Sequence, residues 1–205
     1  MRLPCDAALV LIDLQLAIDD PRWGPRNNPR AEAAIAGLLA AWRAQAMPIV
    51  HVRHDSTEPG SPYAPGSPGH AFKPEAAPQR GETVIGKQTT SAFIAPDLER
   101  ALDALGATTL VMCGVLTNNS LEASARHGGD LGYRIFVVAD ACWAVDKRDL
   151  AGTLWRAEDV HRLALANLQG EYAQVVTSDM AARAAATATV RQRRAERRSA
   201  AQGPG

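Results

Sequence analysis

The chain has 205 residues, 22 of them basic and 22 acidic, so its formal charge at neutral pH is zero. This length suits one domain with a substantial core, and the charge balance argues against nucleic acid or an anionic membrane as the main partner. The longest apolar runs, such as residues 7–12, are too short to span a bilayer and no signal-type segment opens the chain, so we expect a cytoplasmic protein.

The first third of the chain reads as strand, helix, strand. An apolar strand over residues 8–13 ends in Asp13, and another is predicted over 48–53. Between them, Asn28-Pro29 has the residue types that open a helix, a capping side chain followed by proline. The apolar face of that helix comprises Ile35, Leu38, Leu39 and Trp42.

Residues 55–80 interrupt this alternation. They are rich in Pro, Gly and Ser and show little apolar periodicity. A loop of this length within a compact domain is usually functional, so we expect it to form a wall or lid of a site.

Strands and helices alternate again after the loop. Strands are predicted over 83–86, 109–114, 134–139 and 173–177, and helices over 96–105, 120–131 and 157–168. Apolar strands separated by amphipathic helices indicate a parallel sheet covered on both faces. We therefore predict a doubly wound, three-layer α/β domain over residues 1–184, with about six strands. Its ligand should bind beyond the carboxyl ends of the strands.

The C-terminal segment, residues 185–205, differs in composition. It is rich in arginine and has few large apolar side chains. The favoured interpretation is a solvated helix that frays into disorder. A helix that clasps another subunit and an arm that binds nucleic acid are the alternatives.

Three reactive side chains occupy equivalent places in this pattern. Asp13 ends the first strand, Lys87 follows the strand over 83–86, and Ser120 stands where a helix begins after the strand over 109–114. Any one of them alone would be read as a solvated charge or a helix cap. Because the carboxyl ends of parallel strands meet at one edge of the sheet, the three together predict a site there. Free N–H groups at the helix start would favour a negative charge beside Ser120.

The motifs around these residues resemble the isochorismatase-like hydrolases, often called cysteine hydrolases. The similarity covers about residues 5–180. The matching segments are Leu11-Ile-Asp13-Leu-Gln15, Gly86-Lys87-Gln-Thr-Thr-Ser91-Ala-Phe93, Gly114-Val-Leu-Thr117-Asn-Asn-Ser120, Ala139-Asp-Ala141 and His161-Arg-Leu-Ala-Leu-Ala-Asn-Leu168. The resemblance implies a small-molecule hydrolase that forms homo-oligomers.

In amidase members of that family an Asp–Lys–Cys triad is catalytic, and the resemblance places Asp13 and Lys87 on its first two positions. Ser120 occupies the position of the cysteine. A hydroxyl is far less acidic than a thiol and needs activation to become a nucleophile. We expect hydrolysis of an amide-type C–N bond with Ser120 as nucleophile or positioning group. Vinyl ether hydrolysis through Asp13, a catalytically silent binding or assembly protein, and an engineered Cys-to-Ser change are the alternatives.

The resemblance also implies an oxyanion hole at the turn before Ser120. In the family the corresponding peptide bond, here Val115–Leu116, is cis. The N–H groups of Leu116 and Ser120 would then converge on one point and bind an oxyanion.

Further residues are expected to support the site or contact the substrate. These are Gln15, Thr117, Trp23, Phe72 and Trp143. For Gln15 a structural role in satisfying backbone groups is equally favoured. Trp23 and Phe72 lie in loops that should rim the site, whereas for Trp143 packing in the core or between subunits is favoured over substrate contact. Trp155 has the same two interpretations.

No metal or cofactor is predicted. The segment His51-Val-Arg-His54-Asp55 does not match the Asp-x-His spacing with which some nicotinamidases of the family hold a metal, and His70 lies in the long loop. Cys5, Cys113 and Cys142 have neither disulfide nor zinc spacing, and the last two are read as small buried hydrophobic residues.

Overall fold

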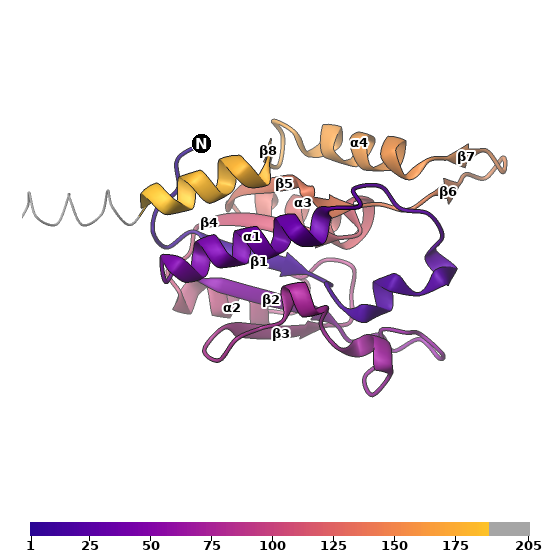
Figure 1. The fold of residues 1–205 in the computed structure, drawn as a ribbon, viewed down its shortest axis with the longest axis horizontal. Helices are drawn as coiled ribbons and strands as arrows, with labels where there is room; N and C mark the ends of the chain where they lie inside the picture. The colour runs from indigo at the N-terminus through magenta and orange to yellow at the C-terminus, as the bar shows by residue number, and fades with distance from the viewer. Residues whose placement is uncertain (189–205) are drawn as a thin grey trace, which may run out of the picture.

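Six parallel strands form the central sheet, which confirms the predicted fold class (Figure 1). The computed structural model describes residues 1–188. The strands are β1 (Ala8–Ile12), β2 (Ile49–His54), β3 (Thr83–Lys87), β4 (Thr109–Val115), β5 (Arg134–Trp143) and β8 (Gln174–Val176), in the order β3-β2-β1-β4-β5-β8. The chain therefore winds outward from β1 in both directions, and the order reverses between β1 and β4.

The central strands are buried along their whole length. Every residue of β1 and β4 is inaccessible to solvent or nearly so. Helices cover both faces of the sheet, so these strands are continuous apolar runs and not alternating ones.

The helices that cover the sheet are α1 (Ala31–Ala44), α2 (Asp97–Ala104), α3 (Glu122–Asp130) and α4 (Ala157–Leu168), and residues 178–188 are also helical. In Figure 1, α1 and the segment 178–188 lie in front of the sheet, and α2 and α3 lie behind it. The predicted apolar face of α1 is buried, and its Trp42 indole N–H donates to the carbonyl of Ala7 at 3.0 Å. None of the helices in the described part of the chain is long and apolar enough to cross a membrane.

The predicted helix start at Asn28 is wrong. Helix α1 begins at Ala31, and Asn28 adopts a positive φ of 46°. Its side-chain amide donates to the carbonyls of Ala139 and Cys142, at 3.0 and 2.6 Å. These acceptors lie in the part of β5 where the register with β4 shifts, so a tertiary contact uses the amide that would otherwise cap the helix.

Two further differences from the prediction concern the second half of the chain. Strand β5 continues to Trp143, and a small antiparallel hairpin follows it, made of β6 (Lys147–Arg148) and β7 (Leu154–Trp155). Ala185 and Ala188, just beyond the predicted domain end at residue 184, are buried in the core, and the predicted boundary itself stays a prediction. The rest of the predicted basic tail, residues 189–205, lies outside the described residues.

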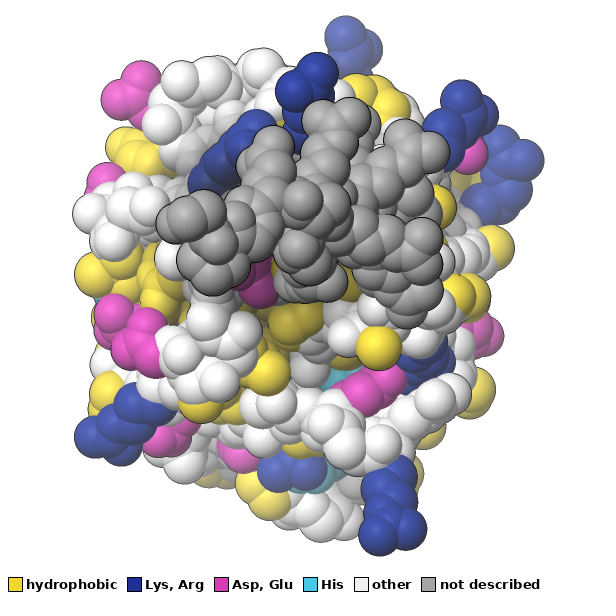
Figure 2. All heavy atoms as spheres, turned by 90° about the vertical axis from the view of Figure 1, so that its left-hand side faces the viewer, with side chains coloured by type: hydrophobic (Ala, Val, Ile, Leu, Met, Phe, Trp, Pro, Cys, Tyr) yellow, Lys and Arg dark blue, Asp and Glu magenta, His cyan; other side chains and the backbone are white. Residues whose placement is uncertain are grey.

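The side of the molecule away from the carboxyl ends of the strands is shown in Figure 2. Positive, negative and hydrophobic side chains are interspersed on it. This mixture agrees with the formal charge of zero.

Candidate active site

The three predicted catalytic side chains meet at the carboxyl edge of the sheet. The Lys87 ammonium lies 2.7 Å from Asp13 Oδ2 and 3.3 Å from Ser120 Oγ, and it donates to both. All three residues are buried, with exposed fractions of 3%, 4% and 8% for Lys87, Asp13 and Ser120. Side chains that are 33 and 74 positions apart in the chain thus form one cluster.

The strands place this cluster. Asp13 follows β1 directly, and its N–H donates to the carbonyl of Val52 in β2 at 2.9 Å. Its positive φ of 54° turns the chain away from the sheet at this point. Lys87 ends β3, two strands away, and its ammonium also donates to the carbonyl of Thr89 at 3.0 Å. The Lys87 side chain therefore reaches across the end of β2 to the aspartate.

Burial governs the protonation of Asp13. It raises the pKa of the Asp13 carboxyl above its usual value, although the charge and hydrogen bond of Lys87 oppose the shift. Oδ2 is occupied by Lys87, whereas Oδ1 is buried without a hydrogen-bond partner in the described part of the chain. An unpaired buried carboxylate oxygen is costly, and it is positioned to take up a proton.

The turn after β4 positions Ser120. Gly114 has a φ of +122°, and a Cβ at this residue would lie 2.1 Å from the carbonyl oxygen of Ile12, so only glycine fits. The Val115–Leu116 peptide bond is cis, as the resemblance implied. Residues Thr117–Leu121 form a kinked turn in which Asn119 has non-helical backbone angles (φ −133°, ψ −107°), so Ser120 precedes α3 by two residues instead of heading it. Its carbonyl accepts a hydrogen bond from Ser124 Oγ at 2.7 Å.

A cavity of about 330 Å³ opens beside the cluster. Asp13, Leu116 and Ser120 line its floor, and Trp23 lines its wall. The backbone N–H of Leu116 donates to no other group within residues 1–188, so it is available to a bound molecule.

Sequence reasoning missed several cavity residues. His54, Tyr63 and Glu58 line the cavity, together with Asn119 from the turn. The signal for Glu58 and Tyr63 was the Pro- and Gly-rich segment 55–80, whose first part lines the cavity as predicted, whereas His54 ends β2 just before it. Which of its side chains face the cavity was not encoded in any local pattern.

Two of the aromatic residues predicted near the substrate do not line the cavity. Phe72 packs edge-on against His51 with ring centroids 5.8 Å apart. Trp143 is fully buried beneath the Arg26 guanidinium, which lies 4.1 Å from its ring centroid. Packing against neighbours within the chain accounts for the positions of the buried Trp143 and the half-buried Phe72, and substrate contact by either residue stays a prediction.

Gln15 binds backbone groups next to the site and does not line the cavity. Its amide nitrogen donates to the carbonyls of His54 and His70, both at 3.0 Å, and its oxygen accepts from the His54 N–H at 2.7 Å. It is fully buried and is not part of the cavity lining. Gln15 therefore joins the end of β1 to the end of β2 and to the long loop, which is the structural role.

Thr117 also acts from outside the cavity. It is fully buried, and its hydroxyl lies 2.8 Å from His161 Nδ1 in α4. Burial lowers the pKa of His161, while Glu158 partly opposes this, so the imidazole is neutral near pH 7. This contact joins α4 to the turn that contains Ser120.

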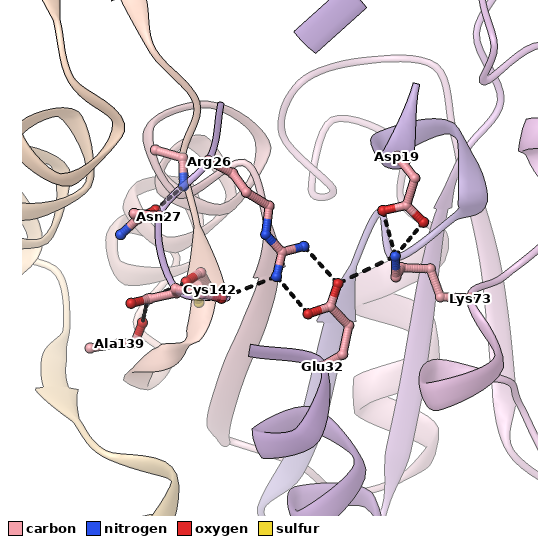
Figure 3. Close-up of polar contacts among 9 residues, drawn as sticks. Asp19, Arg26, Asn27, Glu32, Lys73, Ala139 and Cys142 are labelled. Atoms are coloured by element: carbon pink, nitrogen blue, oxygen red, sulfur yellow. Dashed lines mark hydrogen bonds and ion pairs between the residues drawn. The ribbon is translucent and has the colours of Figure 1, made fainter. Parts of the chain in front are cut away.

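A chain of ion pairs fixes the loops around the cavity (Figure 3). Arg26 donates two hydrogen bonds of 2.6 Å to Glu32 at the start of α1, Lys73 lies 3.3 Å from the same carboxylate, and Lys73 also pairs with Asp19. Burial raises the pKa of Glu32, but the hydrogen bonds and charge of Arg26 and the charge of Lys73 outweigh it and hold the pKa at about 2. The loop before α1 and the long loop are thus tied to one helix end.

The remaining histidines have partners away from the catalytic cluster. His51 Nε2 lies 2.9 Å from Glu82, and His70 Nε2 lies 2.6 Å from Asp55. Within residues 1–188 no group of three or more His, Cys, Asp or Glu is arranged to hold a metal ion.

Neither buried cysteine replaces the missing thiol of the triad. Burial raises the pKa of Cys113 to about 12, and raises that of Cys142 well above its usual value. Neither lines the catalytic cavity. Both therefore fill the role of small buried hydrophobic residues.

A second hollow, of about 520 Å³, lies between the β6–β7 hairpin and α4. Trp155 lines this hollow and not the catalytic cavity, and none of the predicted catalytic residues borders it. Asp13 and Ser120 therefore border the smaller cavity at the strand ends and not this hollow.

The protein thus brings a buried carboxylate, a lysine and a hydroxyl together beside one cavity of a doubly wound α/β sheet, a set of side chains suited to the hydrolysis of a small molecule. Its family follows from comparison with known proteins. The model of the Isochorismatase domain matches residues 7–180, and the chain belongs to the isochorismatase family.

Solved structures and curated relatives agree with this assignment. The chain superposes with a TM-score of 0.87 on the crystal structure of an isochorismatase-family protein from Chromobacterium violaceum, at 53% identity over 90% of this chain and 96% of that one. The isochorismatase family protein YrdC of Bacillus subtilis is 35% identical over 84% of this chain and 92% of its own. Maleamate amidohydrolase of Pseudomonas putida is 33% identical over 83% of this chain and 82% of its own length.

Proposed function

We propose that the protein hydrolyses the C–N bond of an amide-type small molecule through Asp13, Lys87 and Ser120. The observation that carries the proposal is the position of the Lys87 ammonium, 2.7 Å from Asp13 and 3.3 Å from Ser120, two residues that line the cavity. The similarity to maleamate amidohydrolase, a relative named for an amide substrate, supports the choice of bond.

The geometry suits acyl transfer through Ser120. Asp13 Oδ1 has no partner and would accept the hydroxyl proton as Ser120 Oγ attacks the substrate carbonyl carbon. The carbonyl oxygen becomes an oxyanion held by the N–H groups of Leu116 and Ser120, and each such donor is typically worth about 2.7–4 kcal/mol of barrier. Protonated Asp13 then returns its proton to the departing nitrogen, and the C–N bond breaks.

Water completes the reaction. Asp13 takes a proton from a water molecule, the resulting hydroxide attacks the Ser120 ester, and the acid product leaves as Ser120 regains its proton. Lys87 assists both acylation and deacylation, because its positive charge favours the ionised forms of Asp13 and Ser120. It thereby provides part of the activation that a hydroxyl, unlike a thiol, requires.

An activity assay with matched variants tests the proposal. Ammonia release would be measured with primary amides and carbamoyl compounds, and hydrazine release with hydrazides, for the wild type, Asp13→Asn, Ser120→Ala and Ser120→Cys. We expect Asp13→Asn and Ser120→Ala to lose turnover and Ser120→Cys to keep or raise it. Mass spectrometry of the quenched wild type should show an acyl adduct on Ser120. Full activity of Ser120→Ala would exclude the nucleophile role.

Ether hydrolysis is the second candidate, and the burial of Asp13 favours it. A carboxyl with a raised pKa can donate a proton as well as accept one, which vinyl ether cleavage requires. In this case Ser120→Ala would remain active on isochorismate while Asp13→Asn would be inactive. A chain with no Asp13-dependent turnover on any of these substrates would instead be a binding protein.

Homo-oligomerisation stays a prediction. Light scattering coupled to gel filtration would measure the mass in solution against the 21.8 kDa of one chain. A mass of one chain at micromolar concentration would contradict it.

A further inference from the structure

The catalytic cavity contains a carboxylate that hydrolysis does not require. Glu58 lines the rim of the cavity and is exposed to solvent. Within residues 1–188 no lysine, arginine or histidine lies within ion-pair distance of it. The other carboxylate of the cavity, Asp13, has its charge matched by Lys87.

A tight turn holds Glu58 at this place. Residues 58–61 read Glu-Pro-Gly-Ser, with proline and glycine at the two central positions that a type II turn favours. Gly60 has a φ of +73°, and the Ser61 N–H donates to the Glu58 carbonyl at 3.2 Å. The Glu58 N–H in turn donates to Ser56 Oγ at 3.2 Å. The backbone that carries the carboxylate is therefore fixed beside the cavity.

Two aromatic rings that contact each other line the same cavity as Glu58. Trp23 and Tyr63 meet edge to face, with centroids 6.3 Å apart and an interplanar angle of 60°. The indole N–H of Trp23 donates to the carbonyl of Ala17 at 2.7 Å, which fixes its orientation. Aromatic faces attract cations, so these rings and Glu58 favour the same kind of ligand.

The nearby basic groups do not offset the charge of Glu58. Burial lowers the pKa of His54, and the charge of Lys87 lowers it further, so the imidazole in the cavity is neutral at pH 7. Arg22 donates to the carbonyl of Gly60 at 3.4 Å, but it pairs with Asp20 at 3.1 Å and does not line the cavity. The lining contributed by residues 1–188 therefore carries a net negative charge.

We infer that the cavity selects amides whose distal group is cationic, accepts neutral ones less well, and disfavours those with a second carboxylate. Glu58 would be the residue that sets this preference. The inference rests on the proposed function for the identity of the scissile bond, but the charge preference itself can be measured by binding alone.

Three benzamides of similar shape provide the probes: 4-(aminomethyl)benzamide is cationic, 4-ethylbenzamide is neutral, and 4-carbamoylbenzoate is anionic. Their dissociation constants would be measured by NMR titration of the Ser120→Ala protein, with ammonia followed in the same samples to correct for residual turnover. The same titrations would be run with Glu58→Gln and Glu58→Lys added. Glu75→Gln, which removes an exposed carboxylate of the same loop outside the cavity, is the matched control.

We expect the cation to bind about tenfold more tightly than the anion, since exposed charge pairs are each worth a few-fold in affinity. Glu58→Gln should reduce this ratio to about twofold, Glu58→Lys should reverse it, and Glu75→Gln should leave it unchanged. The ratio should shrink in 0.5 M salt because the site is open to solvent.

Three results would overturn the inference: equal or tighter binding of the anion, a ratio unaffected by Glu58→Lys, or binding of none of the three probes. The ammonia-release assay is independent of these titrations. A charge preference without any turnover would refute the proposed hydrolysis and leave the preference standing.

Discussion

Removing the Lys87 ammonium should be among the most destabilising single changes at the site. In Lys87→Met the side chain keeps its length, but Asp13 is left buried with neither oxygen paired. Breaking a buried ion pair by removing one partner typically costs about 3–5 kcal/mol. For a chain of this length that corresponds to a fall in Tm of roughly 6–20 °C.

The loss should depend on pH in a definite direction. Burial already raises the pKa of Asp13, and removing Lys87 removes what opposes that shift. A carboxyl with a raised pKa in the folded state costs stability as pH rises above its unfolded value of about 3.9. The variant should therefore be closest to the wild type near pH 4 and furthest from it near pH 8.

Urea denaturation across this pH range would measure the effect. Lys87→Met combined with Asp13→Asn should recover much of the stability at pH 8, because the uncompensated charge is then gone. Lys147→Met, at an exposed position of β6, controls for loss of a lysine. A cost below about 1 kcal/mol for Lys87→Met, or a double variant no more stable than the single one, would refute this account of the pair.

Three other predictions follow from the surrounding structure. Gln15→Leu leaves three buried backbone groups without partners and should cost about 3 kcal/mol in urea denaturation, and a cost near zero would contradict its supporting role. Because its pKa is lowered, Glu32 stabilises the fold above pH 4.5, and this contribution is lost as the pH falls through about 2. Glu32→Gln should therefore reduce the pH dependence of the free energy of unfolding between pH 4.5 and about 2. Gly114→Ala should cost at least about 2 kcal/mol and abolish turnover, whereas Gly37→Ala in α1, where nothing lies within 4 Å, should be neutral or stabilising. Normal turnover by Gly114→Ala would show that the turn tolerates a Cβ.

The cavity wall illustrates what a sequence pattern leaves open. The segment 55–80 was expected to line a site, yet nothing local distinguished Glu58 and Tyr63, which do, from Phe72, which packs against His51. The same holds for Trp143, whose type suits both a core and a binding site. Neighbours from distant parts of the chain decide each case.

By itself the sequence determined the main strands and helices in chain order, apart from the β6–β7 hairpin and the helix over 178–188, and it predicted that Asp13, Lys87 and Ser120 lie at the carboxyl edge of a parallel sheet. These follow from local periodicity and from the rule that parallel strands share one carboxyl edge. Only the tertiary structure decided that Asn28 bonds β5 instead of capping α1, that Ser120 sits in a kinked turn before α3, and that one oxygen of Asp13 remains unpaired. Each of these depends on which donors and acceptors meet after the chain has folded, and contacts between residues a hundred positions apart leave no periodic trace in the sequence.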